Sequence, residues 1–346
     1  MAILQADDIA DLIKVTQKDL GRLRWTEIAS DLQEYVALPK VLQAEKVSYQ
    51  SGYGIQWNVM VDTSGAAKDT GLFAVDSVNV GDVMQTASAP WRHLTTSYAI
   101  ERREVAMNRD PARIVELVKI RRADAMIDLA QHMETRFWAR PDDANDNEKL
   151  YGIKYWVVGG GASEGFTGGA AYGSTVADLN PSTYTNWKNY SARYAAVSST
   201  DLIRDWRKAA TFTQFKSPVD ISDYNTGTRY GYYTNYNVIG PLEEVLEAQN
   251  DNLGNDIASK DGRLLFRQVP VTWVPHLENT AGDPVYGINW GVFKPVFLSG
   301  EYMKEDGPST APNQHTVFQT FVDCTMNLMC TDRRRNFVLQ TSSYVN

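Results

Sequence analysis

The segment closest to a metal-binding pattern is Asp143-Ala144-Asn145-Asp146-Asn147, where oxygen-bearing side chains alternate as they do in a calcium loop. A calcium loop of that type continues with a glycine and ends on a bidentate glutamate. Glu148 stands at the glycine position and Lys154 at the glutamate position. The segment is therefore interpreted as a solvated turn, and no metal is predicted there.

The other candidate metal ligands are scattered along the chain. The four histidines, which lack the spacing of a zinc-protease helix, are His93, His132, His276 and His315. Cys324 and Cys330 lie six residues apart, so on one strand they share a face about 20 Å apart, too far for a disulfide. Reduced thiols and a cytosolic compartment are expected.

Nucleotide and nucleophile motifs are missing as well. The glycine run 159–161 fits neither a dinucleotide-binding loop nor a P-loop, and it indicates a flexible or ligand-facing surface loop. No serine occupies a nucleophile elbow. The carboxylate pairs at 142–143 and 243–244 fall in a turn and at a helix start, where the helix dipole explains acidic residues. We predict no enzyme, no catalytic residue and no cofactor.

Two arginine runs remain. Arg121 and Arg122 fall inside a predicted helix near Asp124 and Asp128, a spacing that favours ion pairs along the helix. The run 333–335 falls in a tight turn, where three guanidiniums repel one another unless an anion or solvent screens them. Three interpretations stay open: pairing with acidic residues of a neighbouring subunit, contact with DNA, and a solvated turn.

Composition narrows the class of protein. The 346 residues include 34 basic and 42 acidic side chains, a net charge of −8 that argues mildly against a phosphate-gripping surface. With 43% hydrophobic and 22% charged residues the chain is not disordered. No signal peptide or membrane-spanning run is found. Abundant aromatic residues (18 Tyr, 11 Phe, 9 Trp) point to association between proteins.

The first half of the chain is predicted to hold an arm, a long hairpin and a long helix. Apolar spacing indicates arm helices over 9–20 and 25–35. Alternation predicts a strand over 55–61, a tip over 63–71 and a return strand from 73 towards 84, a ribbon that is marginal alone. A helix from Pro111 to Arg140 would be about 45 Å long. Its residues expected to face the β-rich part are Leu117, Val118, Leu129 and Met133.

The second half is predicted to be mixed and then mainly β. Strands are expected over 151–158, 230–237, 264–274, 288–298, 315–329 and 337–340, with helices starting near 199 and 240. The first of these helices should turn Leu202, Ile203 and Trp206 inward. No internal repeat is found, and the element order indicates an α+β protein with an elongated body.

This order, with specific residues, resembles the major capsid proteins of tailed bacteriophages, which have the Hong Kong 97-type capsid fold. The resemblance covers most of residues 50–340. The residues that carry it are, in chain order, Ala89-Pro90-Trp91-Arg92, Glu104-Val105-Ala106-Met107-Asn108-Arg109, Arg121-Arg122-Ala123-Asp124-Ala125-Met126, Phe137-Trp138, Tyr151-Gly152-Ile153-Lys154-Tyr155-Trp156, Trp187-Lys188-Asn189-Tyr190 and Phe215-Lys216-Ser217-Pro218.

The resemblance implies an α+β fold with an N-terminal arm, an extended β-hairpin loop, a long spine helix, and peripheral and axial domains. The arm would be residues 1–50 and the extended loop 51–88. The peripheral domain with the spine helix would be 89–154, the axial domain mainly 155–310, and the C-terminal peripheral strands 311–346.

The implied function is self-assembly through hexamers and pentamers into the icosahedral head shell of a tailed bacteriophage, enclosing double-stranded DNA without sequence-specific binding. The protein would lie in the virion after assembly in the host bacterial cytoplasm. A separate scaffolding protein is expected because only a short arm precedes the hairpin; a portal and a decoration protein are further partners, and no membrane is involved. An encapsulin-like shell enclosing protein cargo stays open as the alternative.

Five residues are predicted to make inter-subunit contacts: Lys68, Asp69, Arg333, Arg334 and Arg335. The first two lie at the hairpin tip and the others in the C-terminal turn. Some members of the family cross-link through a loop lysine, and Lys68 occupies such a tip, although a single exposed lysine is usually only solvated.

Overall fold

A computed structural model describes residues 35–42, 48–72, 81, 83–107, 111–161, 164–215, 230–248, 264–278 and 280–341. The arm helices predicted over 9–20 and 25–35 lie almost wholly outside these residues. Most of the predicted return strand of the hairpin between 73 and 83 lies outside them as well.

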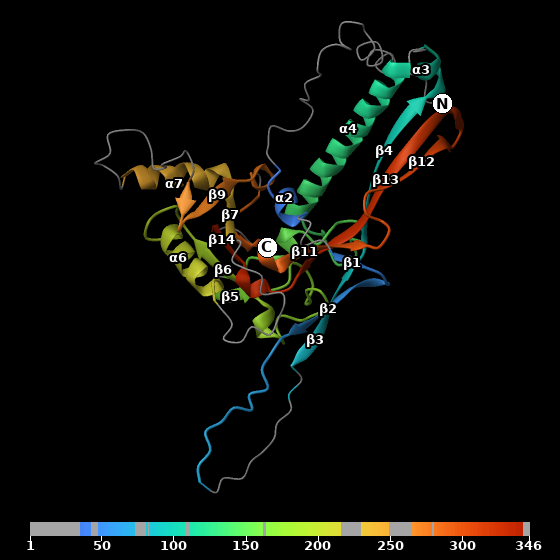
Figure 1. Ribbon diagram of the computed structural model, residues 1–346. Helices are drawn as coiled ribbons and strands as arrows, with labels where there is room; N and C mark the ends of the chain where they lie inside the picture. The colour runs from blue at the N-terminus through green and yellow to red at the C-terminus, as the bar shows by residue number, and fades with distance from the viewer. Residues whose placement is uncertain are drawn as a thin grey trace.

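A five-stranded sheet and the long helix form one half of the subunit (Figure 1). Its strands are β1 (Ser48–Gln50), β4 (Arg92–Glu101), β11 (Phe293–Leu298), β12 (Lys304–Ala311) and β13 (Gln314–Cys330). Helix α4 (Pro111–Trp138) follows the short helix α3 (Arg102–Met107) and lies along β4. At 1.5 Å per residue α4 is about 42 Å long.

The face of α4 that the sequence predicts is the one that packs on the sheet. Leu117, Leu129 and Met133 are buried, whereas Val118 is half-buried. Ala125 and Phe137 complete the buried stripe at helical spacing. The helix is therefore held by apolar packing along most of its length.

A seven-stranded mixed sheet forms the other half. In spatial order its strands are β5 (Gly165–Gly168), β6 (Asn189–Tyr194), β14 (Phe337–Thr341), β10 (Val285–Asn289), β7 (Tyr230–Thr234), β9 (Val269–Trp273) and β8 (Leu265–Phe266). Helices α6 (Leu202–Thr213) and α7 (Tyr236–Ala248) contribute to its core. In α6 Leu202, Ile203 and Trp206 are buried, as the sequence predicts.

The hairpin consists of β2 (Gly54–Met60) paired with β3 (Met84–Pro90). Ile55 and Trp57 are buried in the main core, so the root is fixed to the body. Beyond Val61, every residue from 62 to 72 is exposed, and Figure 1 shows this loop projecting away from the body. The predicted strand over 55–61 is confirmed.

The main core joins both halves. The Trp138 ring of α4 lies 5.3 Å from the Tyr233 ring of β7, centroid to centroid, and Trp57 lies 6.1 Å from Trp156. The short helix α2 (Leu38–Val41) is tied to the same region by the buried carboxylate of Glu134. That carboxylate accepts the N–H groups of residues 36, 37 and 38 and the indole N–H of Trp138 at 2.7–3.1 Å.

Several predicted elements differ from the observed ones. Residues 151–158 hold the short helix α5 (Ile153–Trp156) instead of a strand, and α7 begins at Tyr236 rather than near 240. The single strand predicted over 288–298 is two strands in different sheets, β10 and β11, separated by the 3₁₀ turn η3 (Trp290–Val292). The Asn289 side chain accepts the N–H of Gly291 and so caps that turn.

The sheets do not follow the domain ranges expected from the sequence. β11 lies within the range 155–310 expected for the axial domain and β12 lies at its end, but both strands belong to the five-stranded sheet. β14 falls in 311–346 but belongs to the seven-stranded sheet. The chain therefore crosses from one sheet to the other at residues 290–292 and again at the 3₁₀ turn η4 (Arg333–Arg335).

Candidate interaction surfaces

The hairpin loop presents the first two predicted contact residues. Lys68 and Asp69 lie in the exposed stretch 62–72, which follows the buried Val61. The root is held by Asn186, whose side-chain amide donates to the carbonyl of Val61 at 3.1 Å. The loop thus offers charged side chains on a fixed base, and its role between subunits stays a prediction.

Arg333, the third predicted contact residue, is fully buried within the subunit. Its guanidinium donates to the backbone carbonyls of Trp156, Trp187 and Gly169 at 2.7–2.8 Å, and to the side-chain oxygen of Asn189 at 3.2 Å. The expectation of three exposed, mutually repelling guanidiniums is therefore wrong for this residue. Its side chain has no surface to offer to a neighbour, because four acceptors of its own chain already surround it.

Burial lowers the pKa of the Arg333 guanidinium to about 10, since desolvation disfavours the charged form. At neutral pH it still carries its proton. The charge is stabilised by carbonyl dipoles instead of a carboxylate, which is how a buried ion avoids the full desolvation cost.

Arg334 and Arg335 of the same turn are both half-buried. Both guanidiniums pair with Asp332 through their Nε atoms, at 3.4 and 3.3 Å, and both lie about 5 Å from the Phe215 ring. The Asp332 side chain also accepts the N–H of Arg334 at 3.0 Å, which caps the turn. The Asp332 carboxylate thus pairs with both Arg334 and Arg335, which are adjacent in the sequence.

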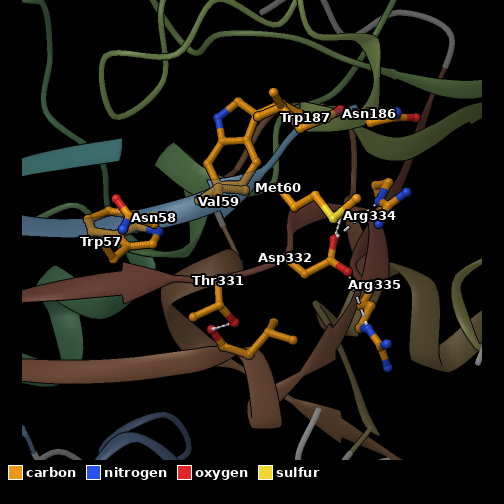
Figure 2. Close-up of a pocket in the computed structure, with 12 residues that line it drawn as sticks. Trp57, Asn58, Val59, Met60, Asn186, Trp187, Thr331, Asp332, Arg334 and Arg335 are labelled. Carbon is orange, nitrogen blue, oxygen red and sulfur yellow. Dashed lines mark hydrogen bonds and ion pairs between the residues drawn. The ribbon is translucent and has the colours of Figure 1, made fainter. Parts of the chain in front are cut away.

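A cleft opens where this turn meets the hairpin root (Figure 2). It has a volume of about 180 Å³, enough for one or two side chains and less than a drug-sized ligand requires. The residues that line it come from four separate segments: Trp57, Asn58, Val59, Met60, Val61, Asn186, Trp187, Val292, Thr331, Asp332, Arg334 and Arg335. No local sequence pattern could have predicted it, because only the fold brings these segments together.

Gly159 and Gly160 pack against neighbouring side chains, whereas Gly161 is exposed, so the prediction of a flexible or ligand-facing loop is wrong for the first two residues of the run. A Cβ atom on Gly160 would lie 2.2 Å from the Thr167 hydroxyl, and one on Gly168 would lie 2.1 Å from the Asn189 side chain. Gly160 donates its N–H to the Ser191 hydroxyl at 2.8 Å. At Gly160 and Gly168 glycine is needed because the backbone lies directly against neighbouring side chains.

Arg121 and Arg122 do not pair along their own helix. Arg121 forms a bidentate ion pair with the buried carboxylate of Glu104, both distances being 2.9 Å. Arg122 pairs with Glu305 of β12. These arginines therefore tie α4 to α3 and to the edge of the five-stranded sheet.

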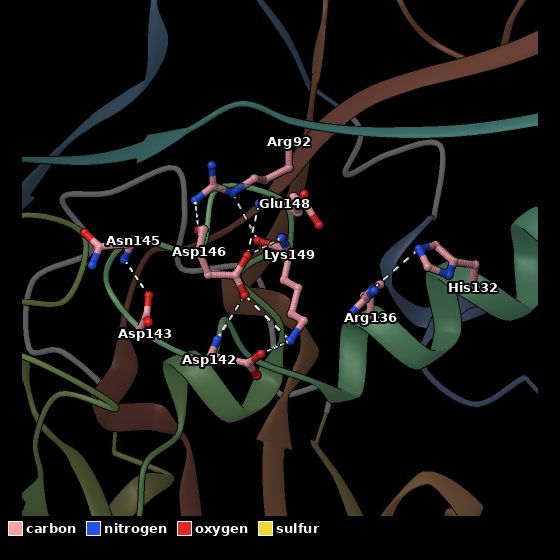
Figure 3. A network of polar contacts seen from close by, with 9 residues as sticks. All are labelled: Arg92, His132, Arg136, Asp142, Asp143, Asn145, Asp146, Glu148 and Lys149. Carbon is pink, nitrogen blue, oxygen red and sulfur yellow. Dashed lines mark hydrogen bonds and ion pairs between the residues drawn. The ribbon is translucent and has the colours of Figure 1, made fainter.

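The acidic segment at 142–149 is a polar turn held by hydrogen bonds within the segment and from Arg92 (Figure 3). The Asp146 carboxylate accepts the N–H groups of Asp142, Glu148 and Lys149 at 3.0–3.2 Å, and these bonds lower its pKa to about 2. Arg92 donates to three carbonyls of the same turn at 2.8–3.1 Å. Within the described ranges no group of three acidic, histidine or cysteine side chains could hold a metal ion.

Two further sequence expectations concern the cysteines and membranes. Cys324 and Cys330 are both free thiols and both buried on β13. None of the helices among the described residues is both long and apolar enough to span a membrane.

Comparison with protein-family models and with curated proteins finds no match. Solved structures do match over nearly the whole chain. The capsid asymmetric unit of cyanophage A-1(L) matches with a TM-score of 0.61 and 16% identity, covering 95% of this chain and 99% of that one. The capsid of a native GTA particle matches with a TM-score of 0.58 and 15% identity, covering 94% and 98%.

A third likeness is to the mature capsid of bacteriophage PhiM1, with a TM-score of 0.53 and 11% identity over 93% of this chain and 92% of that one. At these identities the likeness concerns the fold. The chain has a mixed α+β fold like that of phage capsid proteins, which confirms the predicted fold class.

Proposed function

We propose that this protein is the major capsid protein of a tailed bacteriophage, assembling through hexamers and pentamers into an icosahedral shell around double-stranded DNA. One observation supports this most strongly. The capsid subunits of cyanophage A-1(L) and of the GTA particle are covered over 98–99% of their length by this chain. The likeness thus extends over nearly the whole subunit rather than to one shared domain.

The geometry fits the demands of a closed shell. In a closed shell, one chain must form similar contacts around symmetry axes of different order. A head-to-tail contact between copies closes into a ring when successive rotations return to the first copy. The two sheets share a continuous core, which favours a rigid body, whereas the loop 62–72 is exposed. A net charge of −8 also suits a container, because strong phosphate binding over the inner wall would hinder packing and release of DNA.

Within this proposal the five-stranded sheet with α4 corresponds to the peripheral domain, and the seven-stranded sheet corresponds to the axial domain. Lys68, Asp69, Arg334 and Arg335 are the proposed inter-subunit contact residues. A separate scaffolding protein, a portal and a decoration protein are the proposed partners. The protein would assemble in the host bacterial cytoplasm and remain in the virion.

Electron microscopy of the purified, expressed protein tests the proposal. We expect closed icosahedral particles with pentamers at the vertices and hexamers on the faces. When the particles form in infected cells, nuclease-protected DNA should be their content. Protein cargo in place of DNA would identify an encapsulin-like shell, and a protein that stays monomeric at high concentration would contradict any shell function.

A further inference from the structure

The guanidiniums of Arg334 and Arg335 keep unused hydrogen-bonding capacity. Asp332 meets each of them only at Nε. Within the described part of the chain no hydrogen bond is made by their four Nη groups. Arg335 is nevertheless largely covered, with 13% of its side chain exposed. No Nη atom of either residue is among the buried side-chain atoms that lack a hydrogen-bond partner, so these donors reach solvent and are available to an acceptor from outside the subunit.

The cleft beside these residues carries an excess of positive charge. Two guanidiniums face one carboxylate there, and the remaining lining side chains are neutral. A second carboxylate would balance the charges of Arg334, Arg335 and Asp332. It could also accept two parallel N–H hydrogen bonds from one arginine. The volume of about 180 Å³ suits a single acidic side chain.

The exposed hairpin loop can supply that carboxylate. Asp69 lies in the stretch 62–72, in which every residue is exposed. The loop of the same subunit projects away from the body, whereas its root forms a wall of the cleft (Figure 1). Among the described residues Asp332 is the only carboxylate that lines the cleft, so we look to a second copy of the chain for the other one.

We propose that Asp69 of one subunit inserts into the cleft of the next and pairs with Arg334 and Arg335 there. The inference rests on the proposed function, because it requires repeated copies of this chain. The loop and the cleft are different surfaces of one chain, so the contact is heterologous and can close into a ring. The arginine turn, at the crossing between the two sheets, then holds each subunit in register with its neighbour.

Charge reversal tests the pairing. Asp69→Arg places a third cation at the cleft, and the protein concentration needed for half-assembly should rise about tenfold or more. Adding Arg334→Glu restores one opposite-charge pair and should recover most of the loss. Assembly is measured by light scattering and electron microscopy of the full-length chain. Circular dichroism of the unassembled subunits checks that each variant is folded.

Asp62→Arg is the matched control, since it reverses an exposed carboxylate of the same loop near its root. It should assemble like the parent. Normal assembly of Asp69→Arg, failure of Arg334→Glu to recover it, or an equal loss in Asp62→Arg would each overturn the pairing while leaving the shell function intact. A parent protein that forms no shell and shows no self-association by ultracentrifugation would overturn the proposed function as well.

Discussion

Arg333 carries its charge in the interior of the subunit, surrounded by oxygen atoms of three distant segments. Its guanidinium meets the carbonyls of Trp156, Trp187 and Gly169, which belong to α5, to the turn before β6 and to the glycine-rich stretch. No shorter or neutral side chain can reach all three. We therefore interpret Arg333 as the residue that positions these segments around the sheet crossing.

Arg333→Gln should lower the free energy of unfolding by about 3–5 kcal/mol, because it leaves buried carbonyls without a donor. Urea denaturation of the unassembled subunit measures this. Arg334→Gln is the control, since that side chain is 36% exposed, and it should cost less than about 1 kcal/mol. Equal effects of the two substitutions would contradict the positioning role. If all three arginines of 333–335 were substituted together, the loss of stability from Arg333 could not be separated from an effect of Arg334 and Arg335 on assembly.

Asp146 predicts a pH-dependent contribution to stability. Its folded-state pKa is about 2 against an ordinary 3.8, because backbone N–H groups favour the carboxylate. A group whose pKa is lowered by folding stabilises the protein above its unfolded pKa and loses that effect as the pH falls through its folded pKa. Asp146→Asn should therefore destabilise the subunit most above pH 4. The difference from the parent should shrink between about pH 4 and pH 2 in thermal unfolding scans. A difference that stays constant over this range would show that the charge of Asp146 is not what matters.

At the scale of elements, the long helix follows from periodicity. Leu129 is 2% exposed, and it belongs to the stripe of α4, the helix that packs on β4. Leu129→Ala should cost about 2–5 kcal/mol of unfolding free energy. Ile127→Ala, which removes a half-buried side chain from the same helix, should cost clearly less. A loss below about 1 kcal/mol for Leu129 would mean that the packed face is wrongly assigned.

The elements that the sequence predicts well are those whose burial repeats regularly. α4 and β2 each show one face buried over many residues, and this pattern identifies them without knowledge of the fold. Residues 285–298 are different, because β10 and β11 are both largely buried on both faces. A continuous apolar run cannot reveal that the chain changes sheets in its middle.

Residues 151–158 illustrate the second limit. The run is rich in aromatic and β-branched residues, which favour strands, yet Ile153–Trp156 form one helical turn. Gly152 lies so close to the end of α4 that a Cβ would be 2.4 Å from the carbonyl oxygens of Arg136 and Ala139. Tertiary contact overrides local preference here. The cleft and the burial of Arg333 could not be predicted from the sequence for the same reason. The residues that line the cleft and those that bond to Arg333 come from distant segments.

At the scale of the whole molecule, the two sheets behave as one body. β13 and β14 are consecutive strands in different sheets, and the buried turn at Arg333 links them. The main core includes side chains from both sheets and from the hairpin root. A subunit built in this way transmits a contact at the hairpin to the rest of the body without deforming. Differences between neighbouring environments must then be absorbed by exposed segments such as residues 62–72.

Deleting Thr63–Gly71 should separate folding from assembly. These residues bury no side chain in their own subunit, so the free energy of unfolding should change by less than about 1 kcal/mol. Assembly should fall sharply, because a two-stranded ribbon gains its stability from a neighbouring surface. Sedimentation and electron microscopy measure this, with Asp62→Arg as the variant that retains the full loop. Shells of normal yield from the deletion variant would contradict a role for the loop between subunits. If the deletion abolishes assembly but Asp69→Arg does not, the loop contacts its neighbour at a surface other than the arginine cleft.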